Sequence, residues 1–230
     1  QPIMRVGSEE IFAAEALLRY RDAEGTLIPP YRFIDQLEES GLIVPVGRWI
    51  IDTALRACVE CQKIRPDFKV SINFSYVKSS VYEDLTSAIE KYHLKPESVI
   101  VELTESGYLA RNSIVTKLWR RLKEYGVQMA LDDFGTGYSN LINLSQMQPD
   151  ILKIDREFTC KALNSDYEHQ LLKQIIEMVH SLNIKEVVEG IEEKDELGRI
   201  TAMGPDYIQG YYYSKPCPID DFMDKFIDKE

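Results

Sequence analysis

The chain has 230 residues, enough for one β/α barrel or two small domains, and its hydrophobic fraction of 44% is typical of a globular protein with a large core. The formal charge of −11, from 38 acidic against 27 basic residues, argues against a nucleic-acid polymer as partner, because the sequence has no basic stripe to neutralise phosphates. A small phosphate ester remains a candidate ligand if metal ions reverse the local charge. No apolar run reaches the ~18–20 residues of a membrane span, so we expect no membrane contact from this domain.

Predicted strands and helices alternate along most of the chain. In chain order we expect strands at 1–6 and 11–20, helices at 31–40 and 47–63, a strand at 69–75, a helix at 79–92, a strand at 98–104, a helix at 113–125, a strand at 128–133, a helix at 139–147, a strand at 151–154, a helix at 166–182, a strand at 186–189, a helix at 194–203, a strand at 207–213 and a helix at 219–227. Eight strands, most of them joined by helices, predict an α/β protein with a β/α barrel. A doubly wound open sheet is the competing architecture.

The domain organisation follows from what the sequence lacks. No Pro-, Gly- or Ser-rich linker or low-complexity tract divides the chain, so we expect a single domain over residues 1–230. The chain begins with Gln1 directly in a predicted strand, without a signal peptide. We therefore expect a cytoplasmic domain excised from a longer protein, and that parent protein could be membrane-anchored.

Cysteine and histidine residues show no metal-site pattern. Cys58 and Cys61 form one C-x-x-C late in a predicted helix, with no second pair and no thioredoxin-like context, so we interpret them as packing residues. His93, His169 and His180 lie in or beside predicted helices, away from the predicted strand ends, and we assign them no role.

Seven short apolar segments each end in a carboxylate, an amide or a lysine. The terminal residues are Glu15, Asn73, Glu102, the pair Asp132-Asp133, Lys153, Glu189 and Gln209. Each alone has an ordinary explanation, such as an exposed acid, a turn or a surface ion pair. Together they resemble the polar C-terminal strand ends from which a β/α barrel builds its active site, and core packing would not place unpaired carboxylates there. The pattern predicts an enzyme.

The ligand chemistry of these residues indicates hard divalent cations. Glu15, Asn73, Glu102 and Asp132 offer only oxygen ligands from four strands, which suits Mg²⁺ or Mn²⁺ rather than zinc. The adjacent Asp133 makes a pair that could bridge to a second ion. Lys153 would add a positive charge able to hold an attacking water, beside a glycine-containing loop over residues 133–138.

The ordered motifs resemble those of the EAL domain family, the bacterial cyclic di-GMP phosphodiesterases. The segment Glu15-Ala16-Leu17-Leu18-Arg19 carries the signature that names this family. Further matches are Gln1-Pro2-Ile3, the stretch 33–43, Asn73-Phe74-Ser75, Glu102-Leu103-Thr104-Glu105-Ser106, residues 132–138, Lys153-Ile154-Asp155, Glu189-Gly190-Ile191-Glu192 and Gln209-Gly210-Tyr211. The resemblance implies a modified TIM-type (β/α)8 barrel whose first strand is antiparallel to the rest.

The resemblance also implies an activity and a set of roles. A phosphodiesterase would use two Mg²⁺ or Mn²⁺ ions to activate water and open cyclic di-GMP to linear pGpG. The resemblance implies metal binding by Glu15, Asn73, Glu102, Asp132 and Asp133. It implies water positioning by Lys153, catalysis as base or metal ligand by Glu189, and loop anchoring by Glu105. It also implies a phosphate contact by Arg19 and a guanine contact by Gln1, with Glu192 and Gln209 as site positions of less certain role. Whether Glu189 is base, metal ligand or both stays open.

The resemblance also implies partners for this chain, while a few residues differ from the family pattern and two alternative functions stay open. It implies a homodimer and a parent protein with an N-terminal GGDEF or sensor domain. Tyr20, Leu37 and Glu193 differ from residues common in the family, and the helix that usually precedes Gln1 is missing, which could loosen Gln1. One alternative is a non-catalytic receptor that binds cyclic di-GMP and signals to a partner; another is a barrel that hydrolyses a different phosphodiester.

Overall fold

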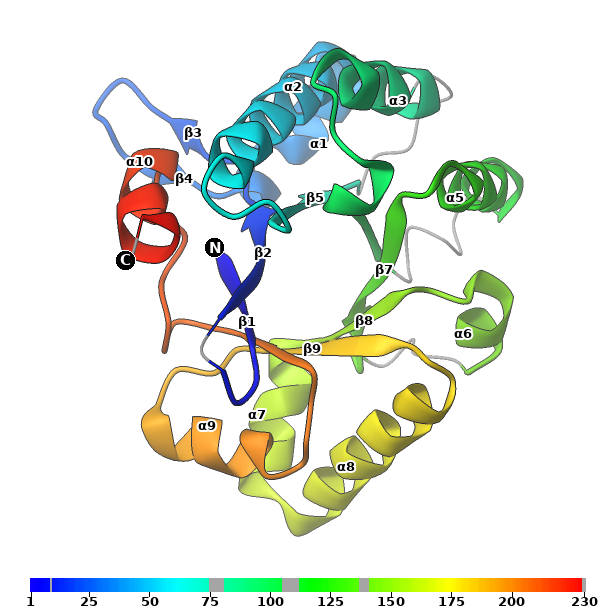
Figure 1. Ribbon diagram of the computed structural model, residues 1–230, viewed down its shortest axis with the longest axis vertical. Helices are drawn as coiled ribbons and strands as arrows, with labels where there is room; N and C mark the ends of the chain where they lie inside the picture. The colour runs from blue at the N-terminus through cyan, green and yellow to red at the C-terminus, as the bar shows by residue number, and fades with distance from the viewer. Residues whose placement is uncertain (9, 75–80, 105–111, 137–140, 229–230) are drawn as a thin grey trace.

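Eight strands close into a barrel, in the order β1-β10-β9-β8-β7-β6-β5-β2, and helices surround it (Figure 1). The computed structural model describes residues 1–8, 10–74, 81–104, 112–136 and 141–228. The barrel strands are β1 (Pro2–Arg5), β2 (Ile11–Ala16), β5 (Lys69–Asn73), β6 (Val99–Thr104), β7 (Gln128–Phe134), β8 (Ile151–Ile154), β9 (Lys185–Glu189) and β10 (Tyr207–Gln209). The α-helices of the described ranges are α1 (Ile34–Glu39), α2 (Ile43–Gln62), α3 (Val81–Lys91), α5 (Asn112–Tyr125), α6 (Leu141–Met147), α7 (Arg156–Asn164), α8 (Asp166–Ser181), α9 (Lys194–Thr201) and α10 (Ile219–Phe222).

The first strand runs against its neighbours, as the family resemblance implies. β1 pairs antiparallel with both β2 and β10, with Ile3 opposite Ala13 and Met4 opposite Ile208. All other barrel pairs are parallel. The closed barrel is confirmed and the open sheet is excluded.

The barrel interior is layered because side chains alternate along each strand. One buried layer lies two residues before the polar strand ends and consists almost entirely of apolar side chains: Ala13, Ile100, Ala130, Ile151, Val187 and Tyr207. The Tyr207 ring stacks on Phe12 with 3.9 Å between ring centroids. The polar residues at the strand ends therefore lie next to a layer of closely packed side chains in the barrel interior.

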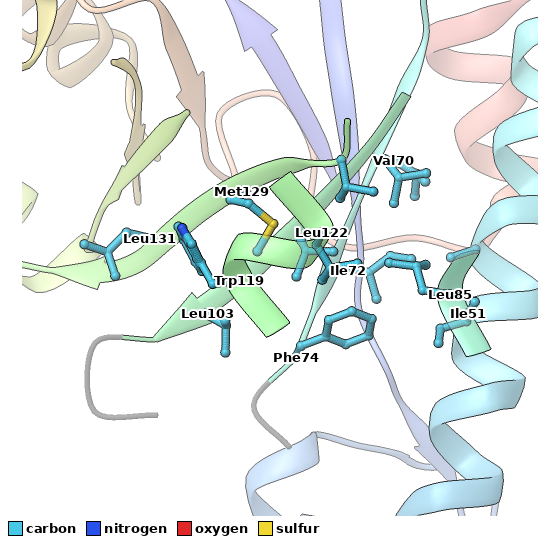
Figure 2. Close-up of a cluster of buried hydrophobic side chains, with 14 of the residues drawn as sticks. Ile51, Val70, Ile72, Phe74, Leu85, Leu103, Trp119, Leu122, Met129 and Leu131 are labelled. Carbon is cyan, nitrogen blue, oxygen red and sulfur yellow. The ribbon is translucent and has the colours of Figure 1, made fainter. Parts of the chain in front are cut away.

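A second core fills the space between the strands and the outer helices. Figure 2 shows this cluster where β5, β6 and β7 meet α2, α3 and α5. Its labelled members are Ile51, Val70, Ile72, Phe74, Leu85, Leu103, Trp119, Leu122, Met129 and Leu131. Each large side chain buried here stabilises the fold by roughly 1.5–3 kcal/mol relative to exposure, so the strand ends are held on a rigid frame.

The predicted strand at 11–20 is too long. β2 ends at Ala16, the last residue with a partner in β5, and Tyr20–Arg21 instead pairs with Leu27–Ile28 in a small hairpin (β3 and β4). The turn between them is closed locally: Thr26 N donates to Asp22 Oδ1 over 2.7 Å, and Gly25 adopts φ +86°.

Two further sequence predictions need correction. The sequence predicts no helix where α7 lies, although Asp155 caps that helix by accepting a hydrogen bond from Glu157 N over 2.7 Å. The last strand ends at Gln209 rather than at residue 213, because Gly210 packs directly against the Ile191 backbone.

Cys58 and Cys61 are buried and free, which confirms them as packing residues on α2. Burial raises the pKa of both thiols to about 12.

No helix in the described ranges is long and apolar enough to cross a membrane.

Candidate active site

Strand register gathers the predicted site residues at one end of the barrel. Parallel pairing places Asn73 opposite Glu102 and Gln209 opposite Glu189. Asp132 pairs with the last residue of β6, and Glu15 lies one residue before the end of β2. These side chains come from neighbouring C-terminal strand ends, the location at which β/α barrels carry their chemistry.

Lys153 is the centre of this group. Its buried ammonium lies 2.8 Å from Glu102 Oε2 and 2.8 Å from Glu189 Oε1. The distances from Nζ to Glu15 Oε2 and Asp132 Oδ1 are 3.4 Å and 3.5 Å. Four carboxylates thus surround one cation inside the barrel.

Amide groups complete the shell around Glu15. Asn73 Nδ2 donates to Glu15 Oε1, and Gln209 Nε2 donates to Glu15 Oε2, each over 2.6 Å. Gln209 Nε2 also contacts Gln1 Oε1 at 3.1 Å, and the Gln1 side chain donates to Ser214 O over 3.0 Å. Gln1 therefore lies beside the site, next to the segment that leads toward α10 (Figure 1).

Ser71 belongs to the site although sequence reasoning missed it. Its hydroxyl donates to Glu102 Oε1 over 2.5 Å, so Glu102 is held by Ser71 on one oxygen and by Lys153 on the other. The available signal was strand alternation, because Ser71 precedes Asn73 by two residues and shares its face of β5.

The electrostatics of the site reflect an excess of buried negative charge. Burial raises the pKa of Glu189 to about 8, even though Lys153 opposes the shift. Burial, followed by repulsion from Glu15, raises the pKa of Glu102 well above its ordinary value. Burial would also raise the pKa of Glu15, but Lys153 and the two amide donors outweigh it and lower that pKa. The carboxylates keep the pKa of Lys153 well above its usual range despite burial.

Asp133 adopts a backbone conformation that is uncommon outside glycine. Its φ is +59°, and its N–H donates to Asp132 Oδ1 over 2.9 Å. Burial, with added repulsion from Asp132, raises the pKa of Asp133 to about 6. The turn thus places two carboxylates side by side at the end of β7.

The remaining predicted residues lie around this centre with different partners. Arg19 lines a cavity of about 410 Å³ together with Gln1 and Glu15, and its guanidinium donates to Leu18 O over 2.7 Å. Glu192 lies at the surface, 2.6 Å from Arg156. Glu105 and residues 137–138 of the predicted loop lie outside the described residues.

The donor set fits divalent metal ions. Glu15, Glu102 and Asp132 supply buried carboxylates, Asn73 supplies an amide oxygen, and Lys153 is the single buried cation among them. Gln209 Oε1 is buried without a hydrogen-bond partner in the described structure. An oxygen-only donor set of this kind suits a hard divalent cation, and such a cation would offset the excess negative charge.

Comparison with known proteins agrees with the geometry. A family model described as the EAL domain matches residues 1–216. The signalling protein YkoW of Bacillus subtilis (strain 168) is 32% identical over 232 aligned positions, which cover 100% of this chain and 29% of YkoW. Cyclic di-GMP phosphodiesterase PdeR of Escherichia coli (strain K12) is 32% identical over 212 positions, covering 91% of this chain and 32% of PdeR.

A solved structure of the EAL enzyme Bd1971, in a form bound to cAMP and cyclic di-GMP, has a TM-score of 0.89 to this chain at 32% identity. The similarity covers 97% of this chain and 62% of that one. Against the two curated relatives, the chain spans about three tenths of their length.

Proposed function

Because this chain belongs to the EAL domain family, we propose that it is a metal-dependent phosphodiesterase that hydrolyses cyclic di-GMP to linear pGpG. The observation that carries the proposal is the buried Lys153, which contacts Glu15, Glu102, Asp132 and Glu189 at the C-terminal ends of the barrel strands. A purely structural core would not retain four carboxylates around one lysine, since each unpaired buried charge is costly.

Two divalent ions, Mg²⁺ or Mn²⁺, complete the proposed site. Glu15, Asn73, Glu102 and Asp132 would hold one ion, and Asp132 with Asp133 would hold the second. When bound, the ions would acidify a water molecule and offset the negative charge that develops on the phosphoryl oxygens.

The protein's own side chains would direct the hydrolysis. Lys153 would orient the attacking water, and Glu189, whose carboxylate lies 2.8 Å from the Lys153 ammonium, would take a proton from that water. Arg19 and Gln1 line one cavity together with Glu15, and they would contact a phosphate and a guanine base of the substrate. The water oxygen would bond to phosphorus, the bond from phosphorus to a ribose 3′ oxygen would break, and that oxygen would take up a proton from solvent, so that the ring opens to a 5′-phosphate and a free 3′ hydroxyl.

Hydrolysis in H₂¹⁸O tests this reaction directly. The proposal predicts that mass spectrometry detects pGpG with one ¹⁸O in its terminal phosphate. A product without label, or a product other than pGpG, would contradict it. Intact nucleotide that nevertheless binds to the protein would instead support the receptor alternative.

A further inference from the structure

A second group of metal-ligand side chains lies at the opposite end of β9 from Glu189. His180 belongs to the last turn of α8, Glu186 to the start of β9, and Asp206 precedes β10 directly. His180 Nε2 lies 3.0 Å from Glu186 Oε1 and 3.0 Å from Asp206 Oδ2. One ligand atom from each residue lies within 4.8 Å of the other two.

This group is separate from the proposed active site. Glu186 and Glu189 are three positions apart in β9, about 10 Å at 3.3 Å per residue. Alternation also turns the two side chains to opposite faces of β9. Glu189 faces Lys153 inside the barrel, whereas Glu186 faces the helix layer and α8.

Glu186 makes this arrangement unusual because its side chain is completely buried. Oε1 accepts a hydrogen bond from Asp206 N over 2.8 Å, but Oε2 has no hydrogen-bond donor in the part of the chain that the structure describes. Asp206 already pairs through Oδ1 with Lys185, at 2.6 Å. A buried carboxylate oxygen beside a second carboxylate is costly unless a cation or donor satisfies it.

One imidazole nitrogen cannot satisfy both acids, because it carries at most one proton. A metal ion could contact all three residues at once. In a tetrahedral zinc site with bonds of about 2.0–2.1 Å, neighbouring ligand atoms lie about 3.3 Å apart. The two separations from His180 Nε2 are close to this value at 3.0 Å, and the ligand atoms of Glu186 and Asp206 lie within 4.8 Å of each other. The side chain of His180 is 38% exposed, which gives an ion access and leaves room for water as a fourth ligand.

We propose that His180, Glu186 and Asp206 bind one Zn²⁺ ion on the outer surface of the barrel. The imidazole nitrogen distinguishes this site from the oxygen-only set at the other barrel end, because imidazole favours zinc over Mg²⁺. The ion joins α8 to the beginnings of β9 and β10, so its expected role is structural, with no part in phosphodiester hydrolysis.

Zinc binding to matched variants tests the site. The metal-free protein is dialysed against graded Zn²⁺ in excess Mg²⁺, and bound zinc is counted by mass spectrometry for wild type, His180→Gln, Glu186→Gln and His93→Gln. His93 is an exposed histidine outside the group and serves as the control. We expect His180→Gln and Glu186→Gln to lose one equivalent, or to bind it at least about tenfold more weakly, while His93→Gln matches wild type.

A structural readout keeps the test independent of variant folding. Crystals of the wild-type protein soaked in Zn²⁺ should show an anomalous-scattering peak between His180, Glu186 and Asp206. The absence of that peak, or equal zinc content in the His180→Gln and His93→Gln proteins, would overturn the proposal. Neither result bears on cyclic di-GMP hydrolysis, which is measured separately.

Discussion

Lys153 and Glu189 form an ion pair inside the barrel, with 2.8 Å between Nζ and Oε1. The two residues come from the adjacent parallel strands β8 and β9, where Lys153 pairs with Val187 and Glu189 closes its strand. The pair therefore joins the residue we propose to orient water with the residue we propose to accept its proton. Rigid strands rather than loops set the distance between them.

Replacing the carboxylate of Glu189 should abolish turnover while preserving binding. Glu189→Gln keeps the size of the side chain but cannot accept a proton or carry charge, so we expect turnover of cyclic di-GMP to fall at least about 100-fold. Nucleotide affinity, measured by calorimetry, should change little. Glu177→Gln on exposed α8 surface is the matched control, and wild-type turnover by the Glu189 variant would remove the residue from the mechanism.

The raised pKa of Glu189 predicts how the metal-free protein responds to pH. Its pKa is about 8 in the folded chain, against about 4.3 for an unperturbed Glu, so between these values the folded state keeps a proton that the unfolded state has released. This group therefore stabilises the fold below about pH 4, and that stabilisation is lost as pH rises through about 8.

Urea unfolding in EDTA measures this dependence. We expect the free energy of unfolding to fall more steeply between about pH 5 and pH 8 for wild type than for Glu189→Gln, which has no titrating carboxyl at this position. Parallel slopes for the two proteins would show that the Glu189 pKa is not raised.

Removing the central cation should destabilise the protein strongly. Lys153→Met leaves several buried carboxylates without their partner, and we expect the free energy of unfolding to fall by ~3–5 kcal/mol at neutral pH. Added Mg²⁺ should restore part of the loss in this variant. Lys161→Met breaks an exposed pair with Glu157 and should have little effect, so equal losses in the two variants would refute a special role for Lys153.

Gly210 should not tolerate a side chain. A Cβ there would lie 2.0 Å from the carbonyl oxygen of Ile191, so Gly210→Ala should cost about 1–3 kcal/mol and displace Gln209. Gly198→Ala, in α9 with nothing within 4 Å of the added atom, should instead stabilise the protein by about 0.5–1 kcal/mol. Thermal unfolding of the two variants distinguishes them, and a neutral Gly210→Ala would contradict the close approach.

The polar strand ends could be predicted from the sequence because each follows a short apolar run. The C-terminal ends of successive barrel strands lie at one end of a β/α barrel, so the sequence also predicts that Glu15, Glu102 and Asp132 lie together. The family resemblance supplied the antiparallel first strand, which no local pattern specifies. Homodimer formation and a GGDEF or sensor domain in the parent protein stay predictions.

Other features depend on contacts between distant segments. Lys153 has four carboxylate neighbours only because five strands meet, and the strand pattern cannot give those distances. The predicted strand at 11–20 runs into β3, and the sequence predicts no strand at β4, because two-residue strands are too short for a periodic signal. The sequence indicates no role for His180, because Glu186 and Asp206 approach it only through the tertiary fold.

The most direct test is chromatography of cyclic di-GMP incubated with this chain in Mg²⁺, in Mn²⁺ and in EDTA. Our account predicts that pGpG appears with either ion, that EDTA abolishes it, and that Glu189→Gln prevents it under all three conditions. Cyclic di-GMP that stays intact with both metals, in a sample shown to be folded, would contradict the proposed phosphodiesterase.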